Sequence, residues 1–116
     1  MDQSGILLVD KPKQWTSHDV VAKLRKITGI RKIGHGGTLD PMATGLLVIG
    51  IGSATKRLEA FVQGDKSYLA TVTFGATSTT DDEEGNLTTV PVETAPDEEA
   101  VRKMIPKFEG VQEQLP

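Results

Sequence analysis

Residues 34–45 constrain this chain more than any other segment, because four glycines here surround a single carboxylate. Pro41 has no N–H and disfavours helical backbone at the preceding residue, so we expect Asp40 to be extended in a stiff loop. Gly36 and Gly37 lack a Cβ, which suits a close approach of the main chain to a ligand or to another segment. The segment therefore predicts a loop that presents the Asp40 carboxylate.

The same Asp-Pro pair has a second interpretation. Many helices begin with an aspartate as N-cap and a proline at the first helical position, which would make Asp40 a capping residue. Taken without the flanking residues, the pair favours the cap. The residues alone leave both interpretations open.

The size and composition of the chain limit the classes of protein to which it can belong. With 116 residues, one domain with a modest core is expected. The chain has no cysteine, which excludes disulfides and thiolate metal sites and fits a reducing cytosol. The longest early apolar run, Ile6 to Val9, is too short for a signal peptide or a membrane span. We therefore expect a cytoplasmic protein without a membrane partner.

Charge is distributed unevenly along the sequence. Residues 1–68 carry 10 Lys/Arg and 6 Asp/Glu, whereas residues 69–116 carry 3 and 10. The net charge of −3 thus combines a basic part, which contains the glycine-rich loop, with an acidic part. A phosphate-backbone partner can dock on the basic part, and the acidic part is expected to face away from it.

The first half of the chain predicts alternating strands and helices. We expect a strand at residues 6–10, followed by a helix with Thr16 and Asp19 in capping-box spacing and Gly29 as terminator. The helical apolar spacing is carried by Val20, Val21, Leu24 and Ile27. The apolar run 46–51, bounded by glycines, predicts a strand covered on both faces.

Further elements are expected after this strand. Ser53 is a candidate cap for a second helix that buries Leu58, Phe61 and Val62 and stops at Gly64. Residues 68–74 alternate in polarity, which is typical of a half-buried strand. A polar, acidic connection at 77–85, a strand at 87–92 and a helix at 97–105 ended by Pro106 complete the chain. This order predicts an α+β fold, with a mixed β-sheet flanked by helices.

Two long motifs carry a resemblance to a known family. The first runs from Gly5 to Pro12 and continues at Thr16-Ser17, and the second comprises Gly34-His35, residues 37–41 and Ala43-Thr44-Gly45. Together they resemble the TruB family of tRNA pseudouridine synthases. Ala54-Thr55-Lys56, Lys66-Ser67-Tyr68 and the acidic segment 77–85 also resemble that family, so the likeness runs along nearly the whole chain.

The resemblance implies a partial pseudouridine synthase fold and the isomerisation of a uridine in the T-loop of tRNA, at position 55, without a cofactor. In that family the aspartate that matches Asp40 is the essential catalytic residue, which either attacks the ribose C1′ or promotes a glycal intermediate by proton abstraction. Both routes need an ionised carboxylate held close to the sugar. The sequence does not choose between them, and it suggests no metal site.

The resemblance also assigns roles to residues around Asp40. The target nucleotide must leave its stack, and His35, with Gly37 and Thr38, is expected to contact the RNA. Tyr68 matches a tyrosine that the family packs against the target uracil and that can help to remove the C5 proton. The alternatives stay open: His35 as a turn residue, and Tyr68 as a core aromatic.

Basic residues form the rest of the expected RNA interface, and some of them have an alternative structural role. The residues expected to contact RNA are Lys11, Arg31, Lys32, Lys56 and Lys66. Lys23, Arg25 and Lys26 could add to a phosphate-binding patch beside the loop, or simply complement the dipole of the preceding helix. Trp15 could offer a stacking platform or close the core.

The chain departs from the family pattern in two respects. It ends where the family continues, so we expect residues 1–116 to be the N-terminal part of a catalytic domain that lacks its C-terminal half and RNA-binding extension. Such a fragment would be catalytically incomplete, and an uncovered sheet edge would offer a route to self-association. Gln14 also stands where the family commonly has glycine.

Two other classes of function remain open at this stage. One is a non-catalytic RNA-binding or RNA-chaperone module that keeps the docking surface without turnover. The other is a phosphate or nucleotide binder, although the chain has neither Walker spacing nor the Gly-x-Gly-x-x-Gly order.

Overall fold

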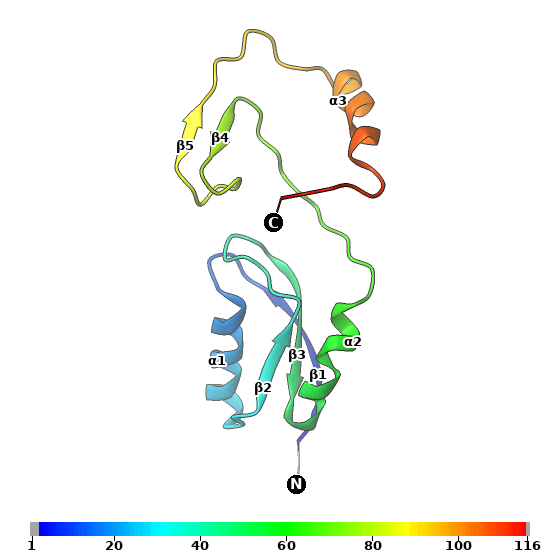
Figure 1. Cartoon of the computed structure of the whole chain (residues 1–116). Coiled ribbons are helices and arrows are strands. Elements are labelled where there is room, and N and C mark those ends of the chain that lie inside the picture. Colours follow the sequence, from blue (N-terminus) through cyan, green and yellow to red (C-terminus); the bar gives the residue numbers. More distant parts are fainter. Residues whose placement is uncertain (1–2, 116) are drawn as a thin grey trace. The chain divides into compact units, whose positions relative to one another are not determined.

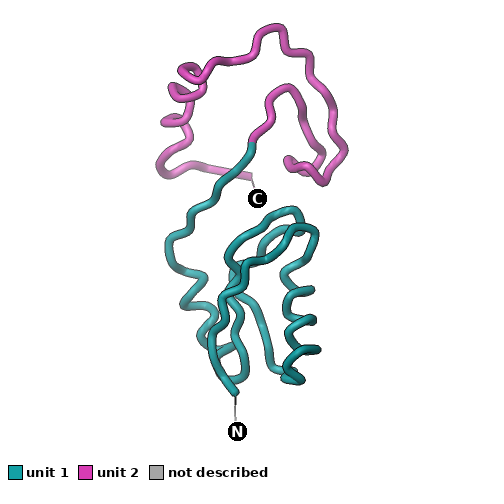
Figure 2. The backbone as a smooth tube through the Cα atoms, turned by 180° about the vertical axis from the view of Figure 1, so that it is seen from behind, with its two compact units in different colours: residues 1–71 teal, residues 72–116 magenta. Residues whose placement is uncertain are grey.

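The computed structural model describes residues 3–115 and divides into two compact units, residues 1–71 and residues 72–116 (Figures 1 and 2). The sequence predicted one domain, whereas the structure groups the last third of the chain separately. Residues 69–71 carry no charge, so the first unit has the net charge of +4 and the second that of −7. The basic and acidic parts of the sequence are thus separate structural units.

The first unit is built on a three-stranded sheet. Strands β1 (Gly5–Lys11), β3 (Gly45–Ile51) and β2 (Ile33–Gly36) lie in the order β1-β3-β2, and both pairings are antiparallel. The predicted α+β class is confirmed. Strands β1 and β2 run in the same direction, as expected for two strands joined through a helix. They do not pair with each other, because β3 lies between them, as in a split β-α-β arrangement.

Helix α1 (Ser17–Thr28) connects β1 to β2 and begins and ends as the sequence predicts. The Thr16 hydroxyl accepts a hydrogen bond from the Asp19 N–H, and the Asp19 carboxylate accepts one from the Thr16 N–H, each at 2.9 Å. These bonds hold the pKa of Asp19 below its ordinary value, so the cap stabilises the helix at neutral pH and is lost as the pH falls through that lowered pKa. Gly29 ends the helix in the left-handed conformation.

The core lies between α1 and one face of the sheet. Leu47 and Ile49 of β3 are fully buried there, against Val20 and Val21 of α1. Ile33 of β2 completes this cluster, and alternate residues of each strand supply it. Ile27, which the helical spacing placed on the buried stripe, is exposed because it lies in the last turn of α1, beyond the cluster.

The opposite face of the sheet is covered by two short helices where Gly50 and Gly36 lie. Gly50 of β3 packs under a 3-10 helix, η1 (Gly52–Arg57), and Gly36 of β2 packs under α2 (Leu58–Val62). Side chains at these two glycines would collide with the covering helices, so their role is the close approach of two chain segments. Leu46 is 64% exposed, so the expected cover on both faces of β3 is present only at the Gly50 end.

The predicted second helix differs from the observed one in its start and in its buried face. Ser53 lies inside η1 and caps nothing; instead its backbone N–H donates to the Ser4 hydroxyl at 3.1 Å. Phe61 is exposed because the short α2 turns only Leu58 and Val62 toward the sheet. A 3-10 turn occupies the place of the expected first helical turn.

The predicted strand at residues 68–74 is wrong. These residues have no regular secondary structure, and Leu69, Val72 and Phe74 are exposed. An extended segment becomes a strand only when a neighbour accepts its backbone hydrogen bonds, and none of the strands in residues 3–115 pairs with it. The alternating pattern alone therefore gave the wrong assignment.

The second unit contains a short hairpin and a helix. Strands β4 (Ala76–Ser78) and β5 (Leu87–Thr89) pair antiparallel, so the expected strand at 87–92 forms only in part. Helix α3 (Glu98–Met104) is capped by Asp97 and continues into a 3-10 turn, η2 (Ile105–Phe108). The predicted helix at 97–105 is confirmed, and Pro106 ends its α-helical part.

The acidic connection between β4 and β5 is a loop with its own short-range hydrogen bonds. The Asp82 carboxylate accepts hydrogen bonds from the Thr80 hydroxyl at 2.5 Å and from the Glu84 N–H at 2.9 Å. These bonds hold the pKa of Asp82 below its ordinary value. Among residues 3–115, no helix has the length and apolar character needed to cross a bilayer.

We predict that Gly50→Ala destabilises the first unit by about 1–2 kcal/mol. A Cβ at this position would lie 2.9 Å from the Cα of Thr55, so η1 would have to move off the sheet. Urea unfolding should show a lower midpoint at an unchanged slope. Gly5→Ala is the matched control, because a Cβ there has nothing within 4 Å. Equal midpoints for the two variants would contradict the packing role of Gly50.

Candidate active site

Asp40 lies in the loop of residues 37–44 that joins β2 to β3. Its backbone carbonyl accepts a hydrogen bond from the Ala43 N–H at 2.9 Å, which closes a β-turn with Pro41 in the second position. The helix-start interpretation of Asp-Pro is therefore wrong. The Asp40 side chain is exposed and has no hydrogen bond or ion pair with the described residues, so its carboxylate is available to a ligand.

The main chain on both sides of Asp40 is fixed by three residues from one short segment. The Ser17 hydroxyl accepts from the Leu39 N–H at 2.9 Å and donates to the Leu39 carbonyl at 3.1 Å. The Pro41 carbonyl accepts from the Gln14 N–H at 2.7 Å and from the Lys11 ammonium at 3.3 Å. We call Lys11, Gln14 and Ser17 the Asp40 anchor.

Lys11 does not have the exposed ammonium that an RNA contact requires. Its side chain is fully buried, and its three N–H donors reach the carbonyls of Pro12 at 3.0 Å, Trp15 at 2.6 Å and Pro41 at 3.3 Å. An ammonium has three donors, so none is left for a phosphate. The expected RNA contact of Lys11 is corrected to a structural role, because a buried cation needs all its donors satisfied.

Gln14 adopts a backbone conformation that favours glycine. Its φ of +71° lies in the left-handed region, which costs a residue with a Cβ roughly 1–2 kcal/mol. This agrees with the expectation that glycine is common at this position of the family. The turn keeps its shape, since the Gln14 N–H still reaches Pro41.

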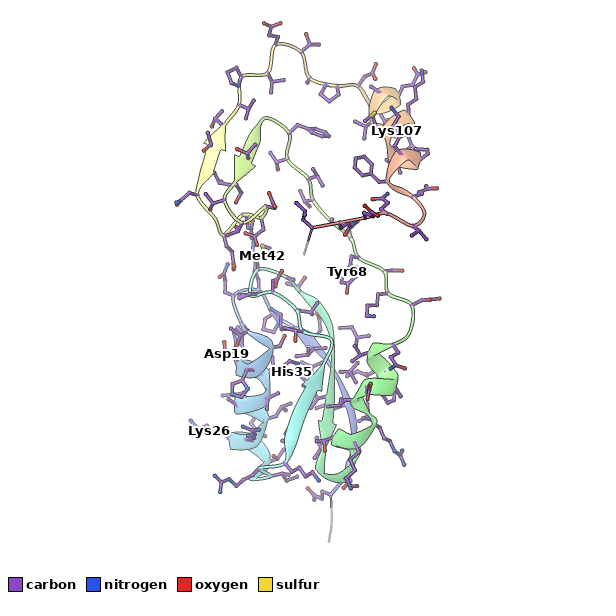
Figure 3. All side chains as sticks on the ribbon, in the orientation of Figure 1. Asp19, Lys26, His35, Met42, Tyr68 and Lys107 are labelled. Atoms are coloured by element: carbon purple, nitrogen blue, oxygen red, sulfur yellow. The ribbon has the colours of Figure 1, made fainter. Side chains whose placement is uncertain are left out.

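His35 is half-buried on β2, on the face of the sheet that packs against α1. It lies opposite Ile49 in the strand register, and its Nδ1 is buried without a hydrogen-bond partner among the described residues. An unpaired buried nitrogen costs about 1–3 kcal/mol. The ring is thus placed five residues before Asp40 at an energetic cost, and Figure 3 shows it beside α1.

Gly37 and Thr38 follow His35 and form the first part of the loop. Gly37 has a φ of +70°, and nothing lies within 4 Å of its ideal Cβ position. The glycine therefore serves the turn out of β2 rather than a close contact. Thr38 is exposed directly before the anchored Leu39, where a ligand can reach it.

Tyr68 and Lys66 follow α2 in the segment without regular structure. Tyr68 is 73% exposed, so the alternative of a core aromatic is wrong. The Lys66 ammonium donates to the Gly64 carbonyl at 3.4 Å and is otherwise exposed. No hydrogen bond in residues 3–115 joins either side chain to the Asp40 loop.

Three further basic residues that were expected to contact RNA lie at the far end of the sheet. Arg31 and Lys32 precede β2, and Lys56 lies in η1 directly after β3, so all three are exposed at the end opposite Asp40 (Figure 1). The Lys32 carbonyl accepts from the Gly52 N–H, which joins the two segments at this end. A seven-residue strand is about 20 Å long, so these cations cannot contact the same nucleotide as Asp40.

Sequence reasoning did not find the roles of Ser17 and Gln14. Ser17 was quoted only as part of a motif, yet it is 2% exposed and bonds both main-chain groups of Leu39. The signal was its polarity: a small hydroxyl directly after the N-cap Thr16 has no capping task of its own, so it can serve another segment.

Comparison with known proteins identifies the family of the chain. Residues 25–116 match the family described as TruB family pseudouridylate synthase (N terminal domain). The chain belongs to this family, and the resemblance seen in the sequence is confirmed.

Among its curated relatives are proteins named tRNA pseudouridine synthase B. That of Leifsonia xyli is 58% identical over 84 residues, 72% of this chain, and that of Arthrobacter sp. is 47% identical over 113 residues, 97% of this chain. The chain spans 28% and 37% of the length of these two relatives. A chain in a solved structure of an H/ACA RNP bound to a substrate RNA containing 2′-deoxyuridine is 46% identical, with a TM-score of 0.47, over 48% of this chain and 18% of that chain.

We predict that Lys11→Met destabilises the first unit by about 2 kcal/mol, because three carbonyls lose a charged donor while the aliphatic stem is kept. The backbone N–H of Gln14 should also exchange its hydrogen faster, since the Pro41 carbonyl is then held by one bond instead of two. Urea unfolding and amide exchange measure the two effects. Lys107→Met, at an exposed lysine, is the control. Unchanged exchange at Gln14 would contradict the anchoring role of Lys11.

Proposed function

We propose that this chain carries the catalytic aspartate of a tRNA pseudouridine synthase, which isomerises a uridine of the T-loop, at position 55, to pseudouridine. The observation that carries the proposal is the Asp40 site: an exposed carboxylate without a partner among the described residues, between two anchored residues. Membership of the TruB family and the names of the curated relatives support it.

The geometry suits a reaction that depends on the position of the carboxylate. Fixing Leu39 and Pro41 limits the backbone movement of Asp40, so the carboxylate can meet a bound sugar without first being ordered. Pro41 adds to this by restricting the backbone of Asp40 itself. The anchored loop thus supplies orientation before the substrate arrives.

Two routes are consistent with this carboxylate. In one, a carboxylate oxygen forms a bond to C1′ while the C1′–N1 electron pair leaves with the uracil; the base rotates, C5 bonds to C1′, and the carboxylate is released. In the other, Asp40 takes the C2′ proton as the C1′–N1 bond breaks, which gives a glycal, and the proton returns when C5 adds. Both end with loss of the C5 proton and protonation of N1, so the product is an isomer of the substrate and its oxidation state is unchanged.

His35 and Tyr68 are proposed to hold the extruded nucleotide. The His35 ring can brace the RNA where the uridine leaves. The exposed phenol of Tyr68 can stack on the uracil and direct its hydroxyl to the C5 proton. Gly37 and Thr38 would meet the RNA through the loop.

Other parts of the chain are proposed to hold the rest of the tRNA. Arg31, Lys32 and Lys56 would contact phosphates about a strand length away from the reacting uridine, and Lys66 would act near Tyr68. The site needs no cofactor for this reaction. A cytoplasmic location follows from the proposed tRNA substrate, and self-association through the free edge of β1 stays a prediction.

Asp40→Asn tests the catalytic role. In the full-length product of the gene, the variant should form no pseudouridine, because an amide neither attacks C1′ nor takes the C2′ proton, while tRNA affinity stays within about threefold, under 1 kcal/mol. Tritium release from tRNA labelled at uridine C5 and filter binding measure the two quantities. Asp65→Asn, at an exposed aspartate outside the loop, is the matched control. Turnover by Asp40→Asn would contradict the catalytic role of Asp40, whereas tRNA binding without turnover by the unaltered protein would favour the non-catalytic RNA-binding alternative.

Tyr68→Phe and Tyr68→Leu separate the two proposed duties of the phenol. Phenylalanine keeps the ring that stacks on the base, so tRNA affinity should be retained, and turnover should fall about 10²- to 10⁴-fold if the hydroxyl moves the C5 proton. Leucine should lower affinity as well as turnover. Single-turnover rates and filter binding of both variants measure this. Full activity of Tyr68→Leu would contradict both duties.

A further inference from the structure

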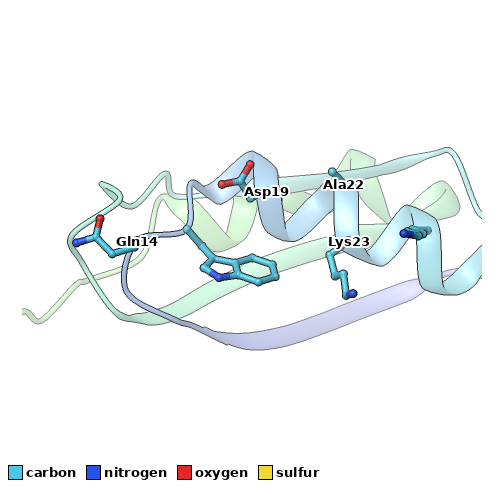
Figure 4. A pocket seen from close by; sticks show the side chains of 6 residues that line it. Gln14, Asp19, Ala22 and Lys23 are labelled. Carbon is cyan, nitrogen blue, oxygen red and sulfur yellow. The ribbon is translucent and has the colours of Figure 1, made fainter.

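An open hollow of about 390 Å³ lies beside α1 and is lined in part by Gln14. Figure 4 shows the side chains that line it, which are Gln14, Trp15, Asp19, Ala22, Lys23 and Lys26. The four helical residues follow the spacing of one helix face. Because Ala22 has only a methyl group, the helix leaves room in front of the indole of Trp15.

Trp15 is placed to stack with a ligand outside the core. The residue is 38% exposed, and its carbonyl is fixed by the Lys11 ammonium at 2.6 Å. The backbone that carries the indole is therefore held in place while part of the residue faces solvent. A half-exposed indole on a fixed backbone is a suitable platform for a nucleic-acid base.

The charges around the hollow fit an anion. Lys23 and Lys26 are exposed and form no ion pair with any residue from 3 to 115, so both ammonium groups are available. The Asp19 carboxylate is already bonded to the Thr16 N–H at 2.9 Å. Lys26 is seven residues further along the helix, about 10 Å away, so a phosphate beside it is remote from the acidic side chain.

Gln14 connects the hollow to the candidate active site. Its N–H holds the carbonyl of Pro41, the residue after Asp40, while its side chain lines the hollow. The left-handed backbone of Gln14 is strained, and glycine would remove that strain without losing the N–H. The Gln14 side chain is thus present at a cost in stability, and its amide lines the same hollow as Trp15, where it can bond to a base edge.

We infer that this hollow binds a second nucleotide of the RNA substrate: its base stacks on Trp15, its edge bonds to the Gln14 amide, and its phosphate lies at Lys23 and Lys26. The inference rests on the proposed function, which supplies RNA as the partner. It adds a subsite that leaves the reacting uridine to Asp40 and gives the tRNA a second point of attachment.

Trp15 is the one tryptophan of the chain, so its fluorescence reports directly on the subsite. In full-length Asp40→Asn protein, unmodified tRNA should quench the emission of Trp15 along the same titration curve as filter binding. Any other tryptophan of the full-length protein is first replaced by phenylalanine. Unchanged emission at saturating tRNA would overturn the inference.

Charge and stacking variants test the subsite by affinity alone. Replacing Lys23 and Lys26 together by alanine should lower the slope of log affinity against log salt by about 0.7, the value for one single-strand phosphate contact, whereas Lys107→Ala should not change it. Trp15→Leu should weaken binding about 5- to 150-fold, and Trp15→Phe should restore most of it. A double-lysine variant that behaves like Lys107→Ala would overturn the inference.

The Gln14→Gly variant separates a loss of tRNA binding from a loss of folding. Relief of the left-handed strain should raise the unfolding midpoint, or leave it unchanged, while tRNA binding weakens. Tighter or equal binding by this variant would overturn the role of the amide. Pseudouridine formation is measured separately. Turnover by Asp40→Asn would contradict the proposed function. Loss of turnover in Asp40→Asn without quenching of Trp15 by tRNA would contradict only this inference.

Discussion

The buried ammonium of Lys11 is the interaction on which the rest of the first unit depends. A cation without water must have every donor occupied, and here three carbonyls from two loops provide the acceptors. Any rearrangement of either loop would leave a charged donor unpaired, which costs far more than an ordinary hydrogen bond. The position of Pro41, and with it that of Asp40, is therefore coupled to the end of β1.

This coupling explains why one short segment serves both the fold and the site. Residues 11–17 run from the end of β1 to the start of α1 and fix the Asp40 loop. The same hydrogen bonds therefore contribute to the stability of the fold and to the orientation of Asp40. The glycines divide into two groups. Gly36 and Gly50 allow helices to approach the sheet, whereas Gly37 allows the turn that leads to the loop. These three roles shape the backbone around the site.

Local signals predicted local structure well. The capping box of Thr16 and Asp19 and the stop at Gly29 are satisfied within a few residues, so their prediction needed no tertiary information. Long-range features were less accessible. The alternation at 68–74 predicted a strand although residues 3–115 offer it no partner. The charge of Lys11 predicted exposure, although its ammonium is buried with the nearby carbonyls of Pro12 and Trp15 and the remote carbonyl of Pro41. Both errors arise because pairing and burial depend on segments remote in sequence.

The sequence by itself determined the elements whose hydrogen bonds close within one turn of chain, the uneven charge, and the family motifs around Asp40. Only the tertiary structure decided which carbonyls meet Lys11, that Ser17 fixes Leu39, and that Trp15 faces an open hollow on α1. The reason is physical: a side chain takes its role from the atoms that folding brings within about 3 Å of it. For Asp40, those surroundings fix the backbone and leave the carboxylate free.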